Sequence, residues 1–258
     1  MASEVLYEVD GKVATITINR PEKLNALSLA AQFALHDAWV RFREDDRVIV
    51  GIVTGAGERS FCAGMDLRRG DGLPPEFEGR SPDEASGSIC PREYDLGKPL
   101  IAAINGYALG MGAAIVMQCD LRIMSENATI GYPLVRMGMM PGALHDFWMQ
   151  APSVIAARAL YTGKAITADD AQRAGLVNDV VPLGDLPAAA RALADEVGEN
   201  APLVIQAIKR TWDTQQEFRE VKAWREFNRL SRTVNASADH DEGIRAQVER
   251  RSPDWQGR

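Results

Sequence analysis

Two glycine-containing junctions hold the residues of this chain whose types and spacing could do chemistry. Residues 58–67 read Glu-Arg-Ser-Phe-Cys-Ala-Gly-Met-Asp-Leu, and residues 103–113 read Ala-Ile-Asn-Gly-Tyr-Ala-Leu-Gly-Met-Gly-Ala. Each is an apolar, strand-like run that breaks at glycine and passes into an expected helix, so backbone N–H groups stay unpaired and point outward. Two such junctions that converge on one point could hold a developing oxyanion.

Strands and helices must bring these junctions together, and their patterns predict an α/β layered fold. The alternating residues on either side of Asp10-Gly11 predict a β-hairpin, and Ser28 can N-cap the helix that follows it. Continuous apolar runs separated by helical patterns predict buried strands joined by crossovers, over Val48–Thr54, Leu100–Asn105 and Leu121–Met124.

Beyond Pro182 the pattern becomes helical throughout. Separate helices are expected over Asp185–Glu199, Pro202–Trp212, Glu217–Val234 and Asp239–Arg250. This shift predicts a boundary between an α/β core, residues 1–195, and a C-terminal helical region, residues 196–258.

Composition and charge exclude several classes of function. With 46% hydrophobic residues, 25% charged residues and a formal net charge of -7, the chain has the balance of a globular protein and no basic patch for nucleic acid. No apolar run approaches the roughly 20 residues of a membrane-spanning helix, and the N-terminus lacks the pattern of a secretory signal.

The cysteines and histidines predict neither a disulfide scaffold nor a metal site. Cys62, Cys90 and Cys119 are odd in number and form no CxxC pair, which favours a reducing cytoplasm. The three histidines are too scattered along the chain for a metal cluster.

Almost the whole chain resembles the crotonase family, also called the enoyl-CoA hydratase/isomerase superfamily. Besides the two junctions, the resemblance rests on Asn19-Arg20-Pro21-Glu22-Lys23-Leu24-Asn25-Ala26-Leu27-Ser28, Cys119-Asp120-Leu121-Arg122, Met140-Pro141-Gly142, Leu160-Tyr161-Thr162-Gly163, Ala171-Gln172-Arg173-Ala174-Gly175-Leu176-Val177, Asp241-Glu242-Gly243 and Glu249-Arg250-Arg251. It implies a spiral of repeated β-β-α units with a C-terminal helical trimerisation region, assembled as a homotrimer or as a hexamer built from two trimers.

The resemblance also implies an acyl-CoA substrate whose thioester enolate is stabilised by two backbone amides. The matching positions are Met65 and Met111, where the family often has Ala and Gly. Because the donor is the peptide N–H, a methionine side chain does not remove it. No separate cofactor is expected, since coenzyme A enters as part of the substrate.

Residues that match the coenzyme A surface of the family lie around the same junctions. They are Lys23, Leu24, Ala26, Ala63, Asp66, Leu67 and Gly110. An ammonium group is a good point-charge partner for a nucleotide phosphate, although Lys23 could equally be an exposed turn lysine. Gly110 leaves room for close approach of the backbone.

The acid/base positions depart from the family. Hydratases use two glutamates to hold the water that adds across the double bond, and the matching residues here are Ala114 and Leu134. A further carboxylate position of some isomerases falls at or near Gly142. As substitutes we consider His145, which titrates near neutral pH, and its neighbour Asp146; both could instead cap a helix.

Two functions follow as hypotheses. The first is an acyl-CoA-processing enzyme of the enoyl-CoA hydratase/isomerase type, a lyase or isomerase, that stabilises a thioester enolate without the usual glutamates. The alternative is a non-catalytic acyl-CoA-binding protein on the same fold. Dinucleotide binding is disfavoured, because Ile115 interrupts the GxGxxG pattern that begins at Gly110.

Overall fold

A computed structural model describes residues 3–66, 89–141 and 144–256. For residues 144–145 and 216–229 it describes the backbone only. Its larger sheet runs in the order β1 (Val5–Asp10), β2 (Val13–Ile18), β3 (Val50–Gly55), β5 (Leu100–Ile104), β7 (Leu121–Ser125) and β10 (Asp179–Val181). Its smaller sheet runs in the order β4 (Ser60–Cys62), β6 (Tyr107–Leu109), β8 (Thr129–Gly131) and β9 (Ile166–Thr167). Strand pairs are parallel except β1–β2 and β8–β9.

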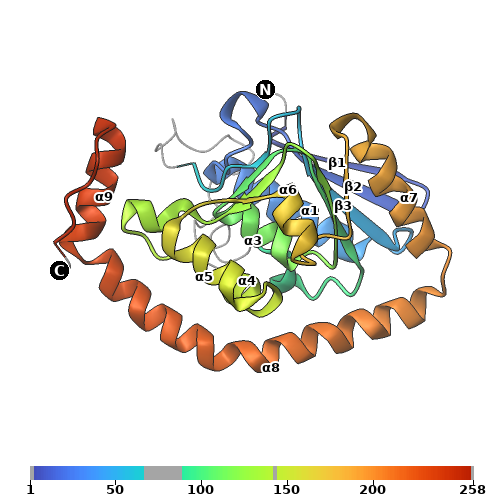
Figure 1. Ribbon diagram of the computed structural model, residues 1–258. Helices are drawn as coiled ribbons and strands as arrows, with labels where there is room; N and C mark the ends of the chain where they lie inside the picture. The colour runs from blue at the N-terminus through green and yellow to red at the C-terminus, as the bar shows by residue number, and fades with distance from the viewer. Residues whose placement is uncertain (1–2, 67–88, 142–143, 257–258) are drawn as a thin grey trace.

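Helices connect and cover these sheets (Figure 1). The α-helices are α1 (Leu29–Glu44), α3 (Met111–Gln118), α4 (Leu144–Gln150), α5 (Ser153–Thr162), α6 (Ala168–Arg173), α7 (Leu186–Gly198), α8 (Pro202–Asn235) and α9 (Ala238–Glu249). Short 3-10 turns are η1 (Pro21–Lys23), η3 (Pro91–Tyr94), η4 (Pro133–Met137) and η5 (Leu183–Asp185).

The chain winds as a spiral in which a strand of the larger sheet is followed by a strand of the smaller one. β3 leads to β4, β5 to β6, and β7 to β8, and the members of each set pair in parallel. This is the α/β arrangement of repeated strand–strand–helix units that the resemblance implies. The predicted hairpin at Asp10-Gly11 is confirmed, and so is the cap, because the Ser28 hydroxyl accepts from the Ala31 N–H at 3.0 Å.

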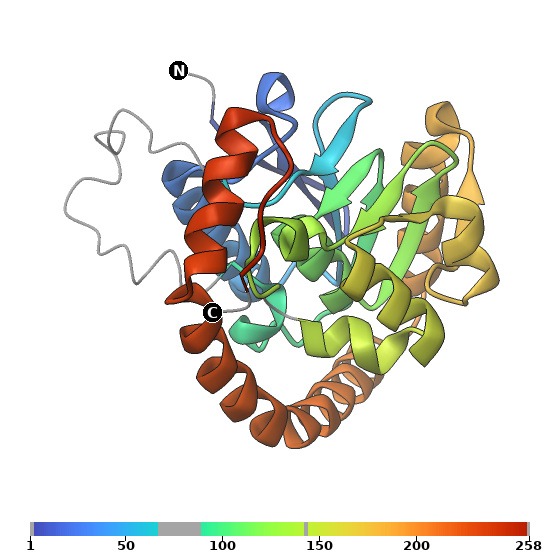
Figure 2. The same cartoon turned by 60° about the vertical axis from the view of Figure 1, so that its left-hand side comes forward.

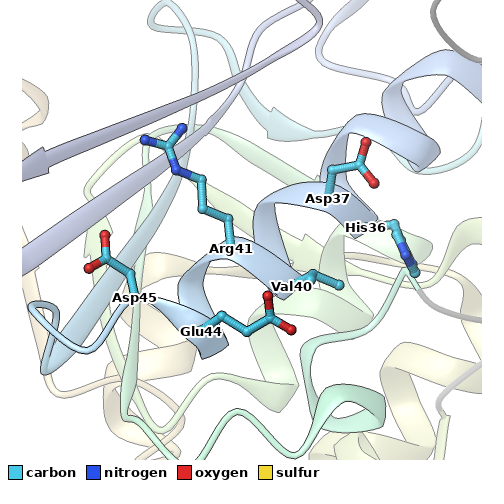
Figure 3. A pocket seen from close by; sticks show the side chains of 6 residues that line it. All are labelled: His36, Asp37, Val40, Arg41, Glu44 and Asp45. Carbon is cyan, nitrogen blue, oxygen red and sulfur yellow. The ribbon is translucent and has the colours of Figure 1, made fainter.

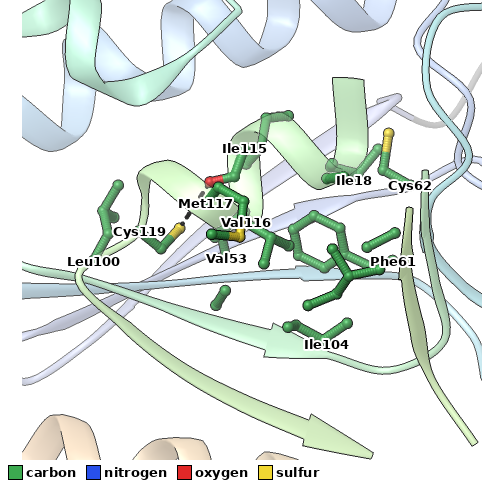
Figure 4. Close-up of a cluster of buried hydrophobic side chains, with 14 of the residues drawn as sticks. Ile18, Val53, Phe61, Cys62, Leu100, Ile104, Ile115, Val116, Met117 and Cys119 are labelled. Atoms are coloured by element: carbon green, nitrogen blue, oxygen red, sulfur yellow. Dashed lines mark hydrogen bonds between the residues drawn. The ribbon is translucent and has the colours of Figure 1, made fainter. Parts of the chain in front are cut away.

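The central strands β3 and β5 of the larger sheet are buried on both faces, as their continuous apolar runs predict. Val50, Ile52 and Ile101 face α7, which contributes Leu186 and Ala190 to the same cluster. Alternate residues face the opposite way, into the core between the sheets and α3. Figure 4 shows this core, in which Val53, Phe61 and Ile104 pack beneath Ile115 and Val116 of α3.

The C-terminal helices differ from the sequence prediction in one respect. A single helix, α8, spans both Pro202–Trp212 and Glu217–Val234, because no glycine or proline lies between them to end it. It runs past the core as a long arc, and α9 turns back toward η4 (Figures 1 and 2). The predicted boundary at residues 195 and 196 falls within α7, and the division into core and assembly region stays a prediction.

Within the described part of the chain, no helix has both the length and the apolarity needed to cross a membrane.

Candidate active site

The first junction follows β4 and is tied to the segment ahead of α1. Leu27 and Met65 form a parallel bridge, in which the Leu27 N–H donates to the Gly64 carbonyl at 2.8 Å and the Asp66 N–H donates to the Leu27 carbonyl at 3.0 Å. In a parallel ladder the N–H of the residue between these two points away from the partner strand. The Met65 N–H therefore faces the opposite side, where the described residues provide no hydrogen-bond acceptor.

The second junction begins α3. Gly110 is its N-cap with φ +55°, and its N–H donates to the Gly131 carbonyl at 2.9 Å, which fixes the turn to β8. The first bond that returns to the cap runs from the Ala114 N–H to the Gly110 carbonyl at 3.0 Å. The Met111 N–H lies in the first turn, so it has no acceptor within the helix, and no side chain caps this end.

Glycine lets the two junctions meet. A Cβ on Gly112 would lie 2.1 Å from the Cys62 carbonyl oxygen, so α3 begins directly against the end of β4. Gly64 has φ +99°, and a Cβ there would lie 3.0 Å from the Leu109 oxygen and 3.5 Å from the Met111 nitrogen. The structure thus brings the backbone around Met65 and Met111 together at one edge of the small sheet.

The cysteines around these amides are neutral. Burial raises the pKa of Cys62 to about 12, and its sulfur accepts the Gly64 N–H at 3.4 Å. Burial also raises the pKa of Cys90, whose sulfur lies 3.7 Å from the Met111 sulfur. Neutral thiols leave the positive ends of the backbone dipoles uncompensated, which favours an anion at this edge.

The predicted coenzyme A residues of the first segment lie beside the first junction. The Ala63 N–H donates to the Leu24 carbonyl at 3.1 Å, and Ala26 precedes the residue that pairs with Met65. Lys23 ends η1 and is exposed, as a phosphate-binding lysine would need to be. Leu67 lies outside the described residues.

Sequence reasoning missed two residues that hold these segments together. The Arg20 guanidinium donates to the Asp66 carboxylate at 3.0 Å and to the Ala26 carbonyl at 2.5 Å. The buried Asn25 side chain accepts from the Arg20 N–H and donates to the Ser60 carbonyl at 2.6 Å. Their place in the quoted motif was the available signal, but polar residues in a turn have no spacing that identifies their partners.

Apolar side chains occupy the two positions, Ala114 and Leu134, that the sequence resemblance aligns with the hydratase glutamates. A Cβ on Gly110 would meet the Leu134 methyl group at 3.3 Å, so this side chain lies against the start of α3. Ala114 is fully buried. The neighbouring Tyr132 is also fully buried against Phe147, and burial raises the pKa of its hydroxyl.

Of the two proposed substitutes for the glutamates, the structure describes the side chain of Asp146 but not that of His145. Asp146 is buried, forms an ion pair with Arg92 and accepts from the Gln118 amide at 2.9 Å. Gln118 ends α3, about 10 Å along the helix from Met111 at about 1.5 Å per residue. The structure therefore does not bring Asp146 to the converging junctions. His145 belongs to α4, and its side chain lies outside the description.

One pocket of the described surface holds charged side chains but lies on another element than this site. A pocket on the outer face of α1 is lined by charged side chains that include Asp37, Arg41 and Glu44 (Figure 3). His36 on its rim is already bonded to the Tyr94 hydroxyl at 2.7 Å. Among the described residues, no three His, Cys, Asp or Glu side chains gather closely enough to hold a metal ion.

Comparison with known proteins gives one consistent family. The family model for enoyl-CoA hydratase/isomerase matches residues 8–258. An (E)-benzylidenesuccinyl-CoA hydratase of Thauera aromatica is 36% identical over 98% of this chain and 99% of its own length. A carnitinyl-CoA dehydratase of Proteus mirabilis is also 36% identical, over the full length of both chains.

Solved structures agree with these matches. The crystal structure of a carnitinyl-CoA hydratase from Mycobacterium avium superimposes with a TM-score of 0.88, at 36% identity over the full length of both chains. An enoyl-CoA hydratase from Mycobacterium smegmatis has a TM-score of 0.78 at 31% identity, covering 90% of this chain and 97% of its own. At these scores the fold of this chain is that of the matched structures.

Proposed function

This chain belongs to the enoyl-CoA hydratase/isomerase family, and we propose that it stabilises the enolate of an acyl-CoA thioester with the backbone amides of Met65 and Met111. As a member of this family it acts on acyl-CoA. The observation that carries the proposal is the pair of outward-facing amides held together by Gly64 and Gly112. Preorganised amides of this kind act where negative charge develops on a carbonyl oxygen.

Coenzyme A would bind along the segment that precedes α1. Lys23 supplies an exposed ammonium for a phosphate, while Leu24 and Ala26 supply backbone and apolar surface beside Ala63. We assign Asp66 an indirect part, because its pairing with Arg20 fixes this segment to the first junction. Leu67 and Gly110 complete the predicted surface.

The reaction would differ from simple hydration. Neither Ala114 nor Leu134 can transfer a proton, so the water-holding pair of the hydratases is absent from this chain in the alignment that the resemblance gives. Loss of CO2 from a malonyl-type thioester forms the enolate without a catalytic base, because cleavage of the C–C bond leaves its electron pair as the enolate. The enolate then takes a proton from water at the α-carbon. Isomerisation or hydrolysis would require a relocated group, for which His145 remains the candidate.

A non-catalytic acyl-CoA-binding protein is the second candidate. The observation that favours it is the Leu134 side chain against Gly110, where a catalytic acid would be expected to lie. Asp146 does not restore one, since Arg92 and Gln118 already engage both of its carboxylate oxygens.

We further propose assembly through the C-terminal helices and a reducing compartment. Helices α8 and α9 expose large apolar side chains, among them Leu203 at 79% and Val248 at 78% of their surface. Such exposure is costly for an isolated chain and supports a homotrimer, or a hexamer of two trimers. The described cysteines are all free, as expected of a cytoplasmic protein.

Mass spectrometry of CoA thioesters incubated with the protein in D2O tests the function. The panel spans enoyl, branched, aromatic, malonyl-type and carnitinyl thioesters, with binding measured in parallel by calorimetry. A product mass, or deuterium gained at the α-carbon, would support the enzyme and give its reaction class. Binding without any change in mass would support the non-catalytic alternative, and failure to bind any thioester would overturn both. Wild-type rates in His145→Ala would remove that residue from the mechanism.

A further inference from the structure

The N-terminal end of helix α3 must stay uncapped if the Met111 N–H is to donate to a substrate. The helix has eight residues, none of them charged, and no side chain caps its start at Gly110. So short a helix is marginal by itself and depends on tertiary contacts for its direction. If Met111 donates to a thioester oxygen, the contacts that aim this amide must lie elsewhere on the helix.

Those contacts lie at the C-terminal end, where Arg122 of β7 folds back over the helix. Its Nε donates to the Val116 carbonyl at 2.9 Å, and its Nη2 donates to the Met117 and Cys119 carbonyls at 3.1 and 2.9 Å. These carbonyls belong to the last turn and the C-cap, where the regular hydrogen bonds of a helix run out. The Val116 carbonyl also accepts from the Cys119 N–H, at 3.2 Å. One planar guanidinium thereby fixes the end of α3 in direction as well as in position.

The same guanidinium joins α3 to the elements around it. Nη1 donates to the Leu176 carbonyl at 3.0 Å, and Nη2 also donates to the Gln150 side chain of α4. The Gln150 amide returns a bond to the Met117 carbonyl at 2.8 Å. Leu176 lies beyond α6, so α3 is held against two other parts of the spiral.

The guanidinium of Arg122 is surrounded by oxygen acceptors at this helix end. Burial lowers the pKa of its guanidinium, yet the group stays protonated. Among the described residues no carboxylate forms an ion pair with it, and its partners are carbonyl oxygens and one amide oxygen. The negative end of the α3 dipole therefore stabilises this charge, together with the carboxylates of Asp120 and Asp146, which act on it from beyond ion-pair distance.

The length of α3 makes its direction matter. Met111 and Gln118 are separated by about 10 Å at about 1.5 Å per residue, so a tilt of about 5° about the clamped end moves the Met111 N–H by about 0.9 Å. Functional groups need to be held to within about 0.5 Å of their productive geometry. A small loosening at Arg122 is enough to misalign the amide.

We propose that Arg122 is a positioning residue, whose bonds to the C-terminal carbonyls of α3 aim the Met111 N–H at the thioester oxygen. The inference rests on the proposed oxyanion site. Arg122 itself touches no reacting atom. A lysine cannot replace it, because a single ammonium does not reproduce the planar fork that spans these carbonyls.

Acetoacetyl-CoA provides a test that needs no turnover, since the enolate of its 1,3-dicarbonyl group absorbs in the near ultraviolet. The pKa of enolate formation is measured for the bound thioester, and the Kd of free coenzyme A is measured separately. In Arg122→Lys we expect this pKa to rise by about one unit, with the Kd of free coenzyme A unchanged. One unit is a tenfold weaker stabilisation of the enolate, which is smaller than the effect of deleting a donor outright. Lys209→Met is the matched control, because Lys209 ties α8 to Asp120 by an ion pair at 3.0 Å and bonds to no carbonyl of α3.

Chemical rescue separates positioning from general destabilisation. A cavity of about 680 Å³ beneath α8 is lined by Arg122, Gln118 and Gln150, so a small cation can reach the space left by Arg122→Ala. Guanidinium ion should restore the low enolate pKa of that variant, and methylammonium should not. If neither arginine variant folds, Gln150→Leu removes one partner of the guanidinium and should give a smaller rise.

The inference would be overturned if folded Arg122→Lys had the same enolate pKa as the wild-type protein. Where the arginine variants do not fold, an unchanged enolate pKa in Gln150→Leu would overturn it. A shift of this pKa in Lys209→Met as large as that in the arginine variant would overturn it as well. If the wild-type protein itself binds acetoacetyl-CoA without lowering its enolate pKa, the oxyanion site fails first, and that failure is visible before any variant is made.

Discussion

Replacing Met111 by proline deletes one predicted oxyanion donor while leaving its helix intact. Met111 is the first residue of α3, where proline is favoured because the missing N–H has no acceptor within the helix. The bond that returns to the cap comes from the Ala114 N–H, so the helix loses no hydrogen bond of its own. We expect kcat on the active thioester to fall by about 10²–10³, or about 3–4 kcal/mol of transition-state stabilisation, as found for the loss of a single oxyanion donor.

Met111→Leu is the matched control, since it changes the partly buried side chain beside Cys90 and keeps the amide. Both variants are assayed for α-deuterium exchange, for coenzyme A affinity and for the free energy of unfolding in urea. Proline should lose the exchange while its affinity and its stability stay near those of the leucine variant. Equal exchange rates in the two variants would refute the assignment of Met111 as a donor.

Three further predictions follow from the same residues. Gly112→Ala should lower the free energy of unfolding by about 1–3 kcal/mol and abolish α-deuterium exchange. The new methyl group would lie 2.1 Å from the Cys62 oxygen and must move α3 away from β4. Gly198→Ala is the control, because nothing lies within 4 Å of its new Cβ, and it should change neither property. The double change of Ala114 and Leu134 to glutamate should create hydration of crotonyl-CoA that the wild-type lacks, and equal hydration by both proteins would contradict the assignment of these positions. Burial raises the pKa of Glu93 from 4.5 to about 7, so the folded state binds the proton more tightly and loses stability as pH rises between these values. Because Glu93 keeps much of its surface in water, the loss should be only about 1 kcal/mol, and Glu93→Gln should flatten the slope of urea midpoints over this range.

The parts of the fold that local sequence controls were predictable. The hairpin follows from Asp10-Gly11, where Gly11 takes φ +60°, and the start of α1 follows from the Ser28 cap. Apolar runs also identified β3, β5 and β7 to within two residues at either end, because strands buried on both faces need no polar alternation. The break expected between Trp212 and Glu217 was wrong, since a polar stretch without glycine or proline gives no physical reason for a helix to end.

Side-chain pairs between distant parts of the chain could not be predicted from the sequence. Arg20 meets Asp66 across 46 residues, and Arg92 meets Asp146 across 54 residues. Neither separation has a period, because these contacts depend on how the spiral stacks its turns. For the same reason Asp146 could be considered as an acid/base group from the sequence, although in the folded chain its carboxylate is occupied at the far end of α3.

Backbone and side-chain chemistry respond differently to sequence change in this architecture. The proposed oxyanion donors are amides, so methionine can stand where the family has smaller residues, provided that Gly64 and Gly112 allow the two junctions to meet. Proton transfer depends on side-chain identity, so a single substitution at an acid/base position is enough to remove it. A chain of this family can therefore keep the step that stabilises an enolate while it changes what the enolate becomes. The fold and the amides identify the shared step, and only the side chains around the acyl group can identify the reaction.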